Sequence, residues 1–226
     1  NDSRYASAFV ERVGRMVQRD MHHPSVIFWS LGNESGIGTN HYAAAAFARS
    51  LDTSRPLHYE GAINGDWRGG HTLTDVICPM YPSIKAIVSH AKSGKQDRPL
   101  IMCEYSHAMG NSNGTLKEYW DAIHSLPGLQ GGFIWEFWDH GIEQTLADGT
   151  TRSAYGGDFG EVRHDGNFVC DGMVFPDRTP KPAMHEFKAI AAPVAFTSTK
   201  AATGNFTITN RQFFKDLAGF GCTWTI

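Results

Sequence analysis

Residues 25–31 of the chain read SVIFWSL, and residues 32–36 continue as GNESG. A short, nearly continuous apolar run of this kind is typical of a strand that is buried on both faces of a parallel sheet. Polar residues that directly follow such a strand lie at the carboxyl end of the sheet, where α/β folds place their functional groups. The stretch therefore predicts an α/β fold and makes Glu34 a candidate functional residue.

Four further strands are predicted from short apolar runs, and they cover residues 57–60, 75–81, 99–105 and 131–138. Helices are predicted over residues 3–21, 40–51, 83–92 and 183–190, and from Thr115 towards Pro127. Asn40 and the TLKE sequence at 115–118 are expected to supply N-terminal caps. Alternating strands and helices indicate parallel βα units, which suit a doubly wound sheet or part of an eightfold barrel. No GxGxxG or P-loop motif marks a nucleotide-binding fold.

The pattern changes after His140. Residues 141–171 are rich in Gly and Asp and carry no predicted strand. From Pro193 onward the sequence is typical of short strands with turns between them, over residues 194–196, 206–209 and 222–226. We therefore assign residues 1–192 to the α/β domain and residues 193–226 to the first strands of an incomplete immunoglobulin-like β-sandwich.

The composition narrows the classes of function. The chain has 226 residues with 20 basic and 23 acidic side chains, so it presents no positive surface for nucleic acid or anionic lipid. With 41% hydrophobic and 19% charged residues, a globular chain that binds neither nucleic acid nor membrane is expected. The cysteines have no CxxC spacing, and three of them stand in apolar, strand-like contexts, so we interpret them as free buried thiols. The four are Cys78, Cys103, Cys170 and Cys222.

Two predicted strand ends each deliver a glutamate into a polar stretch, Glu34 in GNESG at 32–36 and Glu104 in CEYSH at 103–107. Because the carboxyl ends of parallel strands share one edge, we expect these two carboxyl groups to converge. Such a pair suits glycoside hydrolysis, in which a protonated carboxyl assists the leaving oxygen and an ionised one meets the positive charge on the sugar carbon. Either glutamate could instead cap a helix or form an ion pair, and the spacing alone does not decide between these readings.

Five motifs follow one another along the chain: WSLGNESG at 29–36, CPMY at 78–81, CEYSHAMGNS at 103–112, GGFIW at 131–135 and YGGDFG at 155–160. Together they resemble the motifs of glycoside hydrolase family 2, and the resemblance covers nearly the whole chain. It implies a catalytic (β/α)8 TIM barrel, of which this chain would hold about strands four to eight. It also implies a retaining β-galactosidase that releases terminal β-D-galactosyl residues through a covalent galactosyl–enzyme.

The resemblance implies a role for each matching residue of the catalytic centre. Glu34 matches the general acid/base, and Glu104 matches the nucleophile. Tyr81 matches the tyrosine that contacts the nucleophile, where a phenol could hold Glu104 ionised and oriented. Taken without the family, Tyr81 would be an ordinary aromatic residue at the end of a strand.

Three residues match positions that contact the sugar. Asn33 is implied to hydrogen-bond the 2-hydroxyl group, an interaction that strengthens in the transition state. His107 is implied to reach the sugar hydroxyls, and Trp135 to form the platform on which the apolar face of galactose stacks. Taken alone, Trp135 would be a core residue of its strand, and His107 would satisfy backbone groups in a loop.

Two metal sites follow from the same resemblance. Phe168, through its backbone carbonyl, and Asp171 match the pair that binds Na⁺ in the family, in which the second position is Asn. Aspartate is still an oxygen donor suited to a hard cation, and its extra charge is expected to alter affinity or selectivity. Glu34 matches one ligand of a Mg²⁺ site, whose other protein ligands would precede Asn1.

Other interpretations stay open. A β-glucuronidase or β-mannosidase of the family would use the same two glutamates, although HAMGNS at 107–112 and CPMY favour a galactosidase. A non-catalytic carbohydrate-binding or complementation fragment is a reading from a different class. Because the first residue is Asn1 and not Met, we expect a longer parent protein. By analogy with the family, we expect that protein to be cytoplasmic and homo-oligomeric. A half-barrel exposes apolar strand faces, so we expect the isolated chain to fold poorly or to self-associate.

Overall fold

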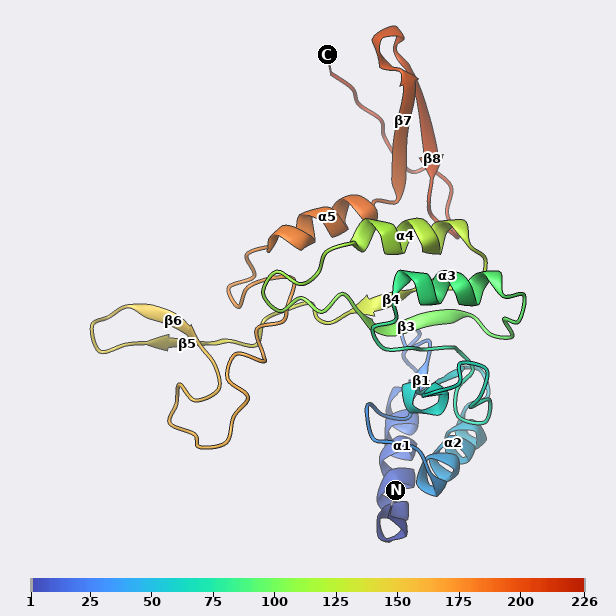
Figure 1. Ribbon diagram of the computed structural model, residues 1–226, viewed down its shortest axis with the longest axis vertical. Helices are drawn as coiled ribbons and strands as arrows, with labels where there is room; N and C mark the ends of the chain where they lie inside the picture. The colour runs from blue at the N-terminus through green and yellow to red at the C-terminus, as the bar shows by residue number, and fades with distance from the viewer. Residues whose placement is uncertain (1, 226) are drawn as a thin grey trace.

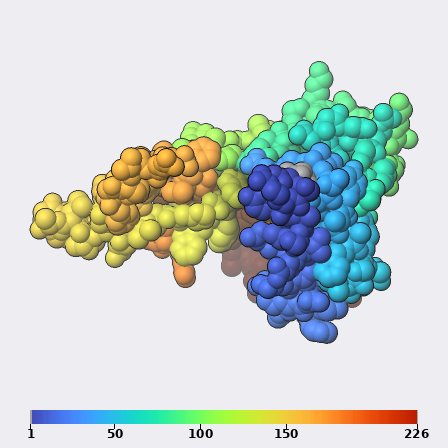
Figure 2. Space-filling model, turned by 90° about the horizontal axis from the view of Figure 1, so that it is seen from below, coloured from blue at the N-terminus to red at the C-terminus, as the bar shows by residue number. Residues whose placement is uncertain are grey.

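The first half of the α/β region is a pair of helices on a short parallel sheet. The computed structural model describes residues 2–225 (Figure 1). A 3-10 helix, η1 (Ser3–Tyr5), leads into α1 (Ala6–Asp20), which is followed by β1 (Trp29–Ser30), α2 (Thr39–Leu51) and β2 (Leu57–His58). The two helices lie side by side (Figure 2). A Cβ atom on Gly14 of α1 would lie 2.4 Å from the ring of Phe47 in α2. The two helices can therefore approach this closely only with glycine at position 14.

The second half repeats the arrangement with longer strands. It contains α3 (Ile84–Lys92), β3 (Leu100–Tyr105), α4 (Leu116–Ser125) and β4 (Leu129–Ile134), and β3 pairs with β4 in parallel. In Figure 1 the two helices cover one face of this sheet. The core between them consists of fully buried apolar side chains, among them Ile77, Ile87, Leu100, Met102 and Leu116.

A seam of irregular chain, residues 75–81, joins the two halves. On one side, Asp75 N donates a hydrogen bond of 2.8 Å to Leu57 O in β2. On the other side, Ile77 and Met80 form isolated parallel bridges with Leu100 and Glu104 of β3. The seam therefore takes the place of a strand between β2 and β3, as the sequence predicts, without forming a regular strand of its own.

The regular strands are shorter than predicted. Of residues 25–31, only Trp29 and Ser30 pair with a neighbour, and the predicted strand 131–138 is replaced by Leu129–Ile134. An apolar run reports burial, whereas a strand also needs a hydrogen-bonding neighbour along its whole length. Ile27, inside the predicted run, is 65% exposed. Within residues 2–225 the strands form four two-stranded sheets and no closed barrel.

Two predicted helix caps are wrong. Gly38 and not Asn40 precedes α2, and Asn40 lies inside the helix, where its side-chain amide donates to the carbonyl of Asp2. Thr115 adopts the left-handed conformation with φ 62°, and its hydroxyl donates to Gly114 O, so the TLKE capping box does not form. By contrast, Ser83 caps α3 by accepting a hydrogen bond from Ala86 N.

Two hairpins and a helix complete the chain. The Gly- and Asp-rich segment 141–171, for which no strand is predicted, contains the hairpin β5 (Ile142–Thr145) and β6 (Thr151–Ala154), which projects from the body of the molecule (Figures 1 and 2). Helix α5 (Pro182–Ile190) leads to a second antiparallel hairpin, β7 (Val194–Lys200) and β8 (Asn205–Asn210). The short 3-10 helices η2 (Glu60–Ile63) and η3 (Ala201–Thr203) follow β2 and β7.

The far C-terminal prediction is only partly met. Residues 222–225 form no strand, and Ile226 lies outside the described residues. The assignment of the β7–β8 hairpin to a sandwich domain stays a prediction. The described helices include none that is long and apolar enough to cross a membrane.

The cysteines are all free thiols, as predicted, but they differ in burial. Cys78 is buried in the seam, Cys103 and Cys170 are partly buried, and Cys222 is exposed. Cys103 and Cys170 are therefore less buried than predicted, and for Cys222 the prediction of a buried thiol is wrong.

Candidate active site

Three strand ends turn in the same unusual way. Glu34 follows β1, Tyr81 is the last residue of the seam, and Ser106 follows β3. Their φ angles are 49°, 47° and 51°. Residues other than glycine adopt this left-handed conformation rarely, because the Cβ atom approaches the backbone. Such residues persist where the surrounding structure fixes them, and they gather at functional sites. The carboxyl ends of three adjacent segments are therefore the first place to look for chemistry.

Glu104 lies at the centre of this edge, partly buried near the end of β3. The phenol of Tyr81 donates a hydrogen bond to its carboxylate. Burial raises the pKa of Glu104, the hydrogen bond from Tyr81 lowers it, and the charges of Glu34 and Glu60 raise it. The charge of Glu34 thus acts on the carboxyl group of Glu104. The phenol pKa of Tyr81 is raised by burial and by its bond to Glu104.

Glu34 lies on an exposed turn whose backbone is anchored to β2 and to the residues after it. Its N–H donates a hydrogen bond of 2.6 Å to Oε1 of Glu60. In the next residue, the Ser35 hydroxyl lies 3.0 Å from the Tyr59 phenol oxygen and 3.2 Å from His41 Nε2. Asn33, directly before Glu34, is also exposed.

The direction of the hydrogen bonds in this turn follows from chemistry. Tyr59 donates its hydroxyl proton to the carbonyl of Gly36, which can only accept. Ser35 must then donate to Tyr59, and His41 Nε2 must donate to Ser35. Burial lowers the pKa of His41, and the chain of hydrogen bonds requires a proton on its Nε2. Three consecutive residues, 34–36, are therefore held by side chains of α2 and of the β2–η2 segment.

A second group of predicted residues forms an aromatic wall beside Glu104. The rings of Tyr81 and His107 have centroids 6.0 Å apart, and those of His107 and Phe168 are 5.7 Å apart. Trp135, one residue past β4, is 38% exposed, and its indole N–H donates a 3.2 Å hydrogen bond to Asp171 Oδ2. His107 Nε2 lies 3.7 Å from the same oxygen. Exposed aromatic faces with polar edges suit the stacking of a sugar ring.

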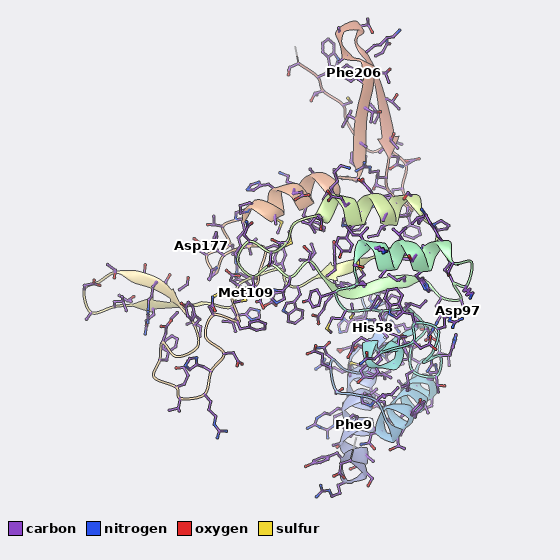
Figure 3. The ribbon with its side chains drawn as sticks, in the orientation of Figure 1. Phe9, His58, Asp97, Met109, Asp177 and Phe206 are labelled. Atoms are coloured by element: carbon purple, nitrogen blue, oxygen red, sulfur yellow. The ribbon has the colours of Figure 1, made fainter. Side chains whose placement is uncertain are left out.

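Two further titratable residues adjoin Asp171. Burial, together with the Asp171 carboxylate at hydrogen-bond distance, raises the pKa of Glu136 to about 7. The nearby His140, whose Nε2 lies 3.2 Å from Glu136 Oε2, lowers that pKa. The loop that contains Met109 (Figure 3) is joined to the end of β4, because Ala108 N donates a 2.7 Å hydrogen bond to Trp135 O.

A profile of the TIM barrel domain of glycosyl hydrolases family 2 matches residues 1–196 of the chain. The chain belongs to glycosyl hydrolase family 2. Three relatives are named β-galactosidase. The one from Leuconostoc mesenteroides is 45% identical to this chain, the one from Lactococcus lactis 46% and the one from Vibrio cholerae 43%. The matches cover 95% or 96% of this chain and 22% of each relative, so the family 2 chain spans about a fifth of their length.

Two solved structures share the fold of this family 2 chain. A β-glucuronidase from Ruminococcus gnavus has a TM-score of 0.57 and 23% identity, over 81% of this chain and 35% of its own. A β-galacturonidase from Eisenbergiella tayi, bound to galacturonate, has a TM-score of 0.59 and 17% identity, over 83% and 37%. At these identities the likeness concerns the fold alone. The α/β class and the TIM barrel assignment are confirmed.

The donor atoms of this family 2 chain fit one of the two predicted metals. Asp171 is 3% exposed, and its Oδ1 is buried without a hydrogen-bond partner among the described residues. An orphaned carboxylate oxygen of this kind suits a hard cation such as Na⁺. For Mg²⁺, residues 2–225 contain no group of three or more His, Cys, Asp or Glu side chains that could hold a metal ion. Glu34 is the one expected ligand within this chain, so the Mg²⁺ site stays a prediction.

Sequence reasoning missed several residues of the family 2 site. Glu60 is the last residue of the predicted strand 57–60, and it therefore stands at a strand end as Glu104 does in the predicted strand 99–105. The same rule of strand ends would have found it. The Ser35, His41 and Tyr59 contacts join residues from α2 and the end of β2, and no spacing in the sequence indicates them.

Proposed function

We propose that the polypeptide containing this chain is a retaining β-galactosidase. The observation that carries the proposal is the pair of carboxyl groups at the ends of β1 and β3, with Tyr81 hydrogen-bonded to one of them. Relatives that share 41–46% identity over nearly all of the chain and are named β-galactosidase support it. The β-glucuronidase structures, at 22–23% identity, bear on the fold and not on the sugar.

In the proposed reaction, Glu104 is the nucleophile. Its carboxylate attacks the anomeric carbon as Glu34 gives a proton to the leaving oxygen, and a covalent galactosyl–enzyme forms. Glu34 then takes a proton from water, which attacks the same carbon and releases galactose with retained configuration. The hydrogen bond from Tyr81 keeps the Glu104 carboxylate ionised against the burial that opposes its charge.

The neighbouring side chains are proposed to hold the sugar. Trp135 offers an exposed indole face for the apolar side of galactose, fixed in orientation by its N–H bond to Asp171. His107 and Asn33 are the proposed partners of the sugar hydroxyls. A neutral or protonated imidazole and an amide can both donate to a hydroxyl oxygen, and such bonds give orientation more than affinity.

Na⁺ is the cation proposed for this chain. Asp171 and the backbone carbonyl of Phe168 would hold it, and a bound cation would supply a ligand position for a sugar hydroxyl. The chain's own contribution is to keep Asp171 in place through the indole of Trp135. Of the predicted Mg²⁺ site only Glu34 belongs to this chain, and no step is derived through that cation.

The cell compartment and the assembly state follow from analogy. Free cysteines suit a reducing compartment, and we propose a cytoplasmic protein that forms homo-oligomers. Light scattering of the complete natural polypeptide that contains this chain measures the oligomer, and a monomeric mass would contradict this proposal.

The decisive experiment is to trap the covalent intermediate. The complete natural polypeptide is incubated with a 2-deoxy-2-fluoro-β-galactosyl donor, and its intact mass is measured. A single adduct that maps to the peptide around Glu104, and is lost in Glu104→Gln, is expected. Turnover of galactosides without any adduct would contradict the assignment of Glu104 or the retaining mechanism. Faster hydrolysis of a nitrophenyl glucuronide or mannoside than of the galactoside would contradict the choice of sugar.

A further inference from the structure

Glu60 is a third glutamate at the strand ends. It is the first residue of η2 and follows β2, which pairs with β1. Its Oε1 accepts the 2.6 Å hydrogen bond from the N–H of Glu34. A short bond from a backbone N–H to a carboxylate is among the stronger hydrogen bonds in proteins. Glu60 therefore contacts the backbone of the proposed acid/base and not its carboxyl group.

The other oxygen of Glu60 has no partner. Oε2 is buried, and no hydrogen bond reaches it among the described residues. Nearby His58 is no counter-ion, because burial lowers the pKa of its imidazole, and its own Nε2 is buried and unpartnered as well. In Figure 3, His58 lies beneath β3, where the two halves of the molecule meet. A buried carboxylate with one satisfied oxygen destabilises a fold, so stability does not explain this residue.

The bond to Glu60 acts at a strained point. Glu34 has φ 49°, a conformation that its backbone leaves unless neighbouring groups hold it. The side-chain contacts of Ser35 fix the residue after it, and Glu60 fixes the N–H of Glu34 itself. Without Glu60 the backbone of Glu34 is free to relax towards an ordinary conformation, which would swing its carboxyl group away from the edge that holds Glu104.

We propose that Glu60 is a positioning residue, which holds the Glu34 carboxyl at the leaving oxygen by fixing the backbone N–H of Glu34. The inference rests on the proposed glycosidase function. Loss of this positioning is expected to affect some steps of the reaction and not others. Protonation of the leaving group and activation of water depend on Glu34, whereas attack by Glu104 does not.

Leaving-group dependence tests this role in the complete natural polypeptide. In Glu60→Ala, kcat/KM for an alkyl β-galactoside, whose leaving oxygen needs a proton, is expected to fall about 100-fold, in the range of general acid contributions. The 2,4-dinitrophenyl galactoside leaves without a proton, so its kcat/KM is expected to fall less than about 5-fold. Glu60→Gln keeps an oxygen that can accept the N–H, and it is expected to recover most of the loss.

Azide gives a second readout. Azide needs no general base, so it is expected to raise kcat of Glu60→Ala on the dinitrophenyl galactoside and to form β-galactosyl azide. In that step the bond from the anomeric carbon to nitrogen forms as the bond to the Glu104 oxygen breaks, and Glu104 leaves as the free carboxylate. The unsubstituted polypeptide and the matched control Glu118→Gln, an exposed residue of α4, are expected to show no such response.

The outcomes separate the two proposals. Equal losses on both leaving groups with no azide product, or no loss at all, would overturn the role of Glu60 while the galactosidase stands. If Glu60→Ala does not fold, two other variants test the role of Glu60. Full activity of Glu60→Leu would overturn that role. So would a Glu60→Gln variant that hydrolyses the alkyl galactoside as slowly as a Glu34→Gln variant does. Absence of galactoside turnover by the unsubstituted polypeptide would overturn the proposed function and this inference with it.

Discussion

Tyr81 and Glu104 are joined twice. Tyr81 N donates a 2.8 Å hydrogen bond to Glu104 O, and the phenol of the same tyrosine donates to the Glu104 carboxylate. The backbone bond fixes the seam against β3, and the side-chain bond joins the same two segments. The orientation of the carboxylate is thus set by the pairing of two neighbouring chain segments, which makes the geometry insensitive to motions of exposed loops.

Removing this phenol is expected to move the acid limb of the pH–rate profile. Activity requires an ionised Glu104, so it falls as the pH drops through the pKa of that carboxyl. The bond from Tyr81 lowers the pKa, and in Tyr81→Phe the limb should shift to higher pH. We also expect kcat to fall on the order of 10²-fold, as for the loss of one preorganised donor. An unchanged acid limb of kcat/KM would contradict the bond's electrostatic role, and Tyr155→Phe serves as the control.

Asp171 is expected to control a dependence on sodium. Replacing Na⁺ by choline should raise KM for a galactoside in the unsubstituted polypeptide, because the orphaned Oδ1 would lose its cation. In Asp171→Ala, KM should be high and the same in both salts. The control is Asp165→Asn, an exposed carboxyl in the same segment, which should keep the response. A sodium response that survives in Asp171→Ala would show that the cation binds elsewhere.

Gly172 is expected to tolerate no side chain. A Cβ atom there would lie 2.2 Å from Asp139 N and 2.3 Å from the carbonyl carbon of Trp138, so backbone must move. Gly172→Ala should destabilise the fold by about 1–3 kcal/mol or more, as in other overpacked sites. It should also displace Asp171 and raise KM. Thermal melts and KM of Gly172→Ala are compared with those of Gly219→Ala, where nothing lies within 4 Å. Equal melting temperatures would count against the packing.

The four thiols are expected to react in the order of their exposure. Burial raises the pKa of Cys78 to about 11 and of Cys103 to about 12, so neither forms thiolate at pH 8. Iodoacetamide at pH 8 should label Cys222 first and reach Cys78 and Cys103 only after denaturation, as read by peptide mass spectrometry. Cys222→Ser should lose the fast label. Labelling of native Cys103 as fast as Cys222 would show that β3 is more open than described.

Much of this architecture was predictable because apolar runs in the sequence indicate which segments are buried. The run at 99–105 yields β3, with bounds one residue apart from the observed ones, since β3 has neighbours on both sides. The run at 25–31 pairs over only two residues, because β1 has one neighbour among the described strands. Hydrogen-bonded length depends on partners that a local pattern does not contain. The same holds for Thr115, whose hydroxyl bonds to Gly114 instead of capping α4.

The candidate site divides in the same way. Glu34 and Glu104 were predictable, since each stands at a strand end and each carries the chemistry of a carboxyl group. The contacts of Asp171 with Trp135 and His107 were not, because they join three segments whose approach is set by the loops between them. No residue of the 155–171 region has a period or spacing that indicates which of its carboxyl groups turns inward.

The seam has a stereochemical consequence. Glu34 belongs to the half built on α1, α2 and β2, while Glu104 belongs to the half built on β3 and β4, and residues 75–81 splice the two. Carboxyl groups about 5 Å apart give retention at the anomeric carbon, and those about 6.5 to 9.5 Å apart leave room for water and give inversion. The distance between the two carboxyl groups is therefore set by how the seam joins the two halves, and not by either half alone. A change in how residues 75–81 pack against either half would therefore alter the distance between the two carboxyl groups, and with it the anomer that is released.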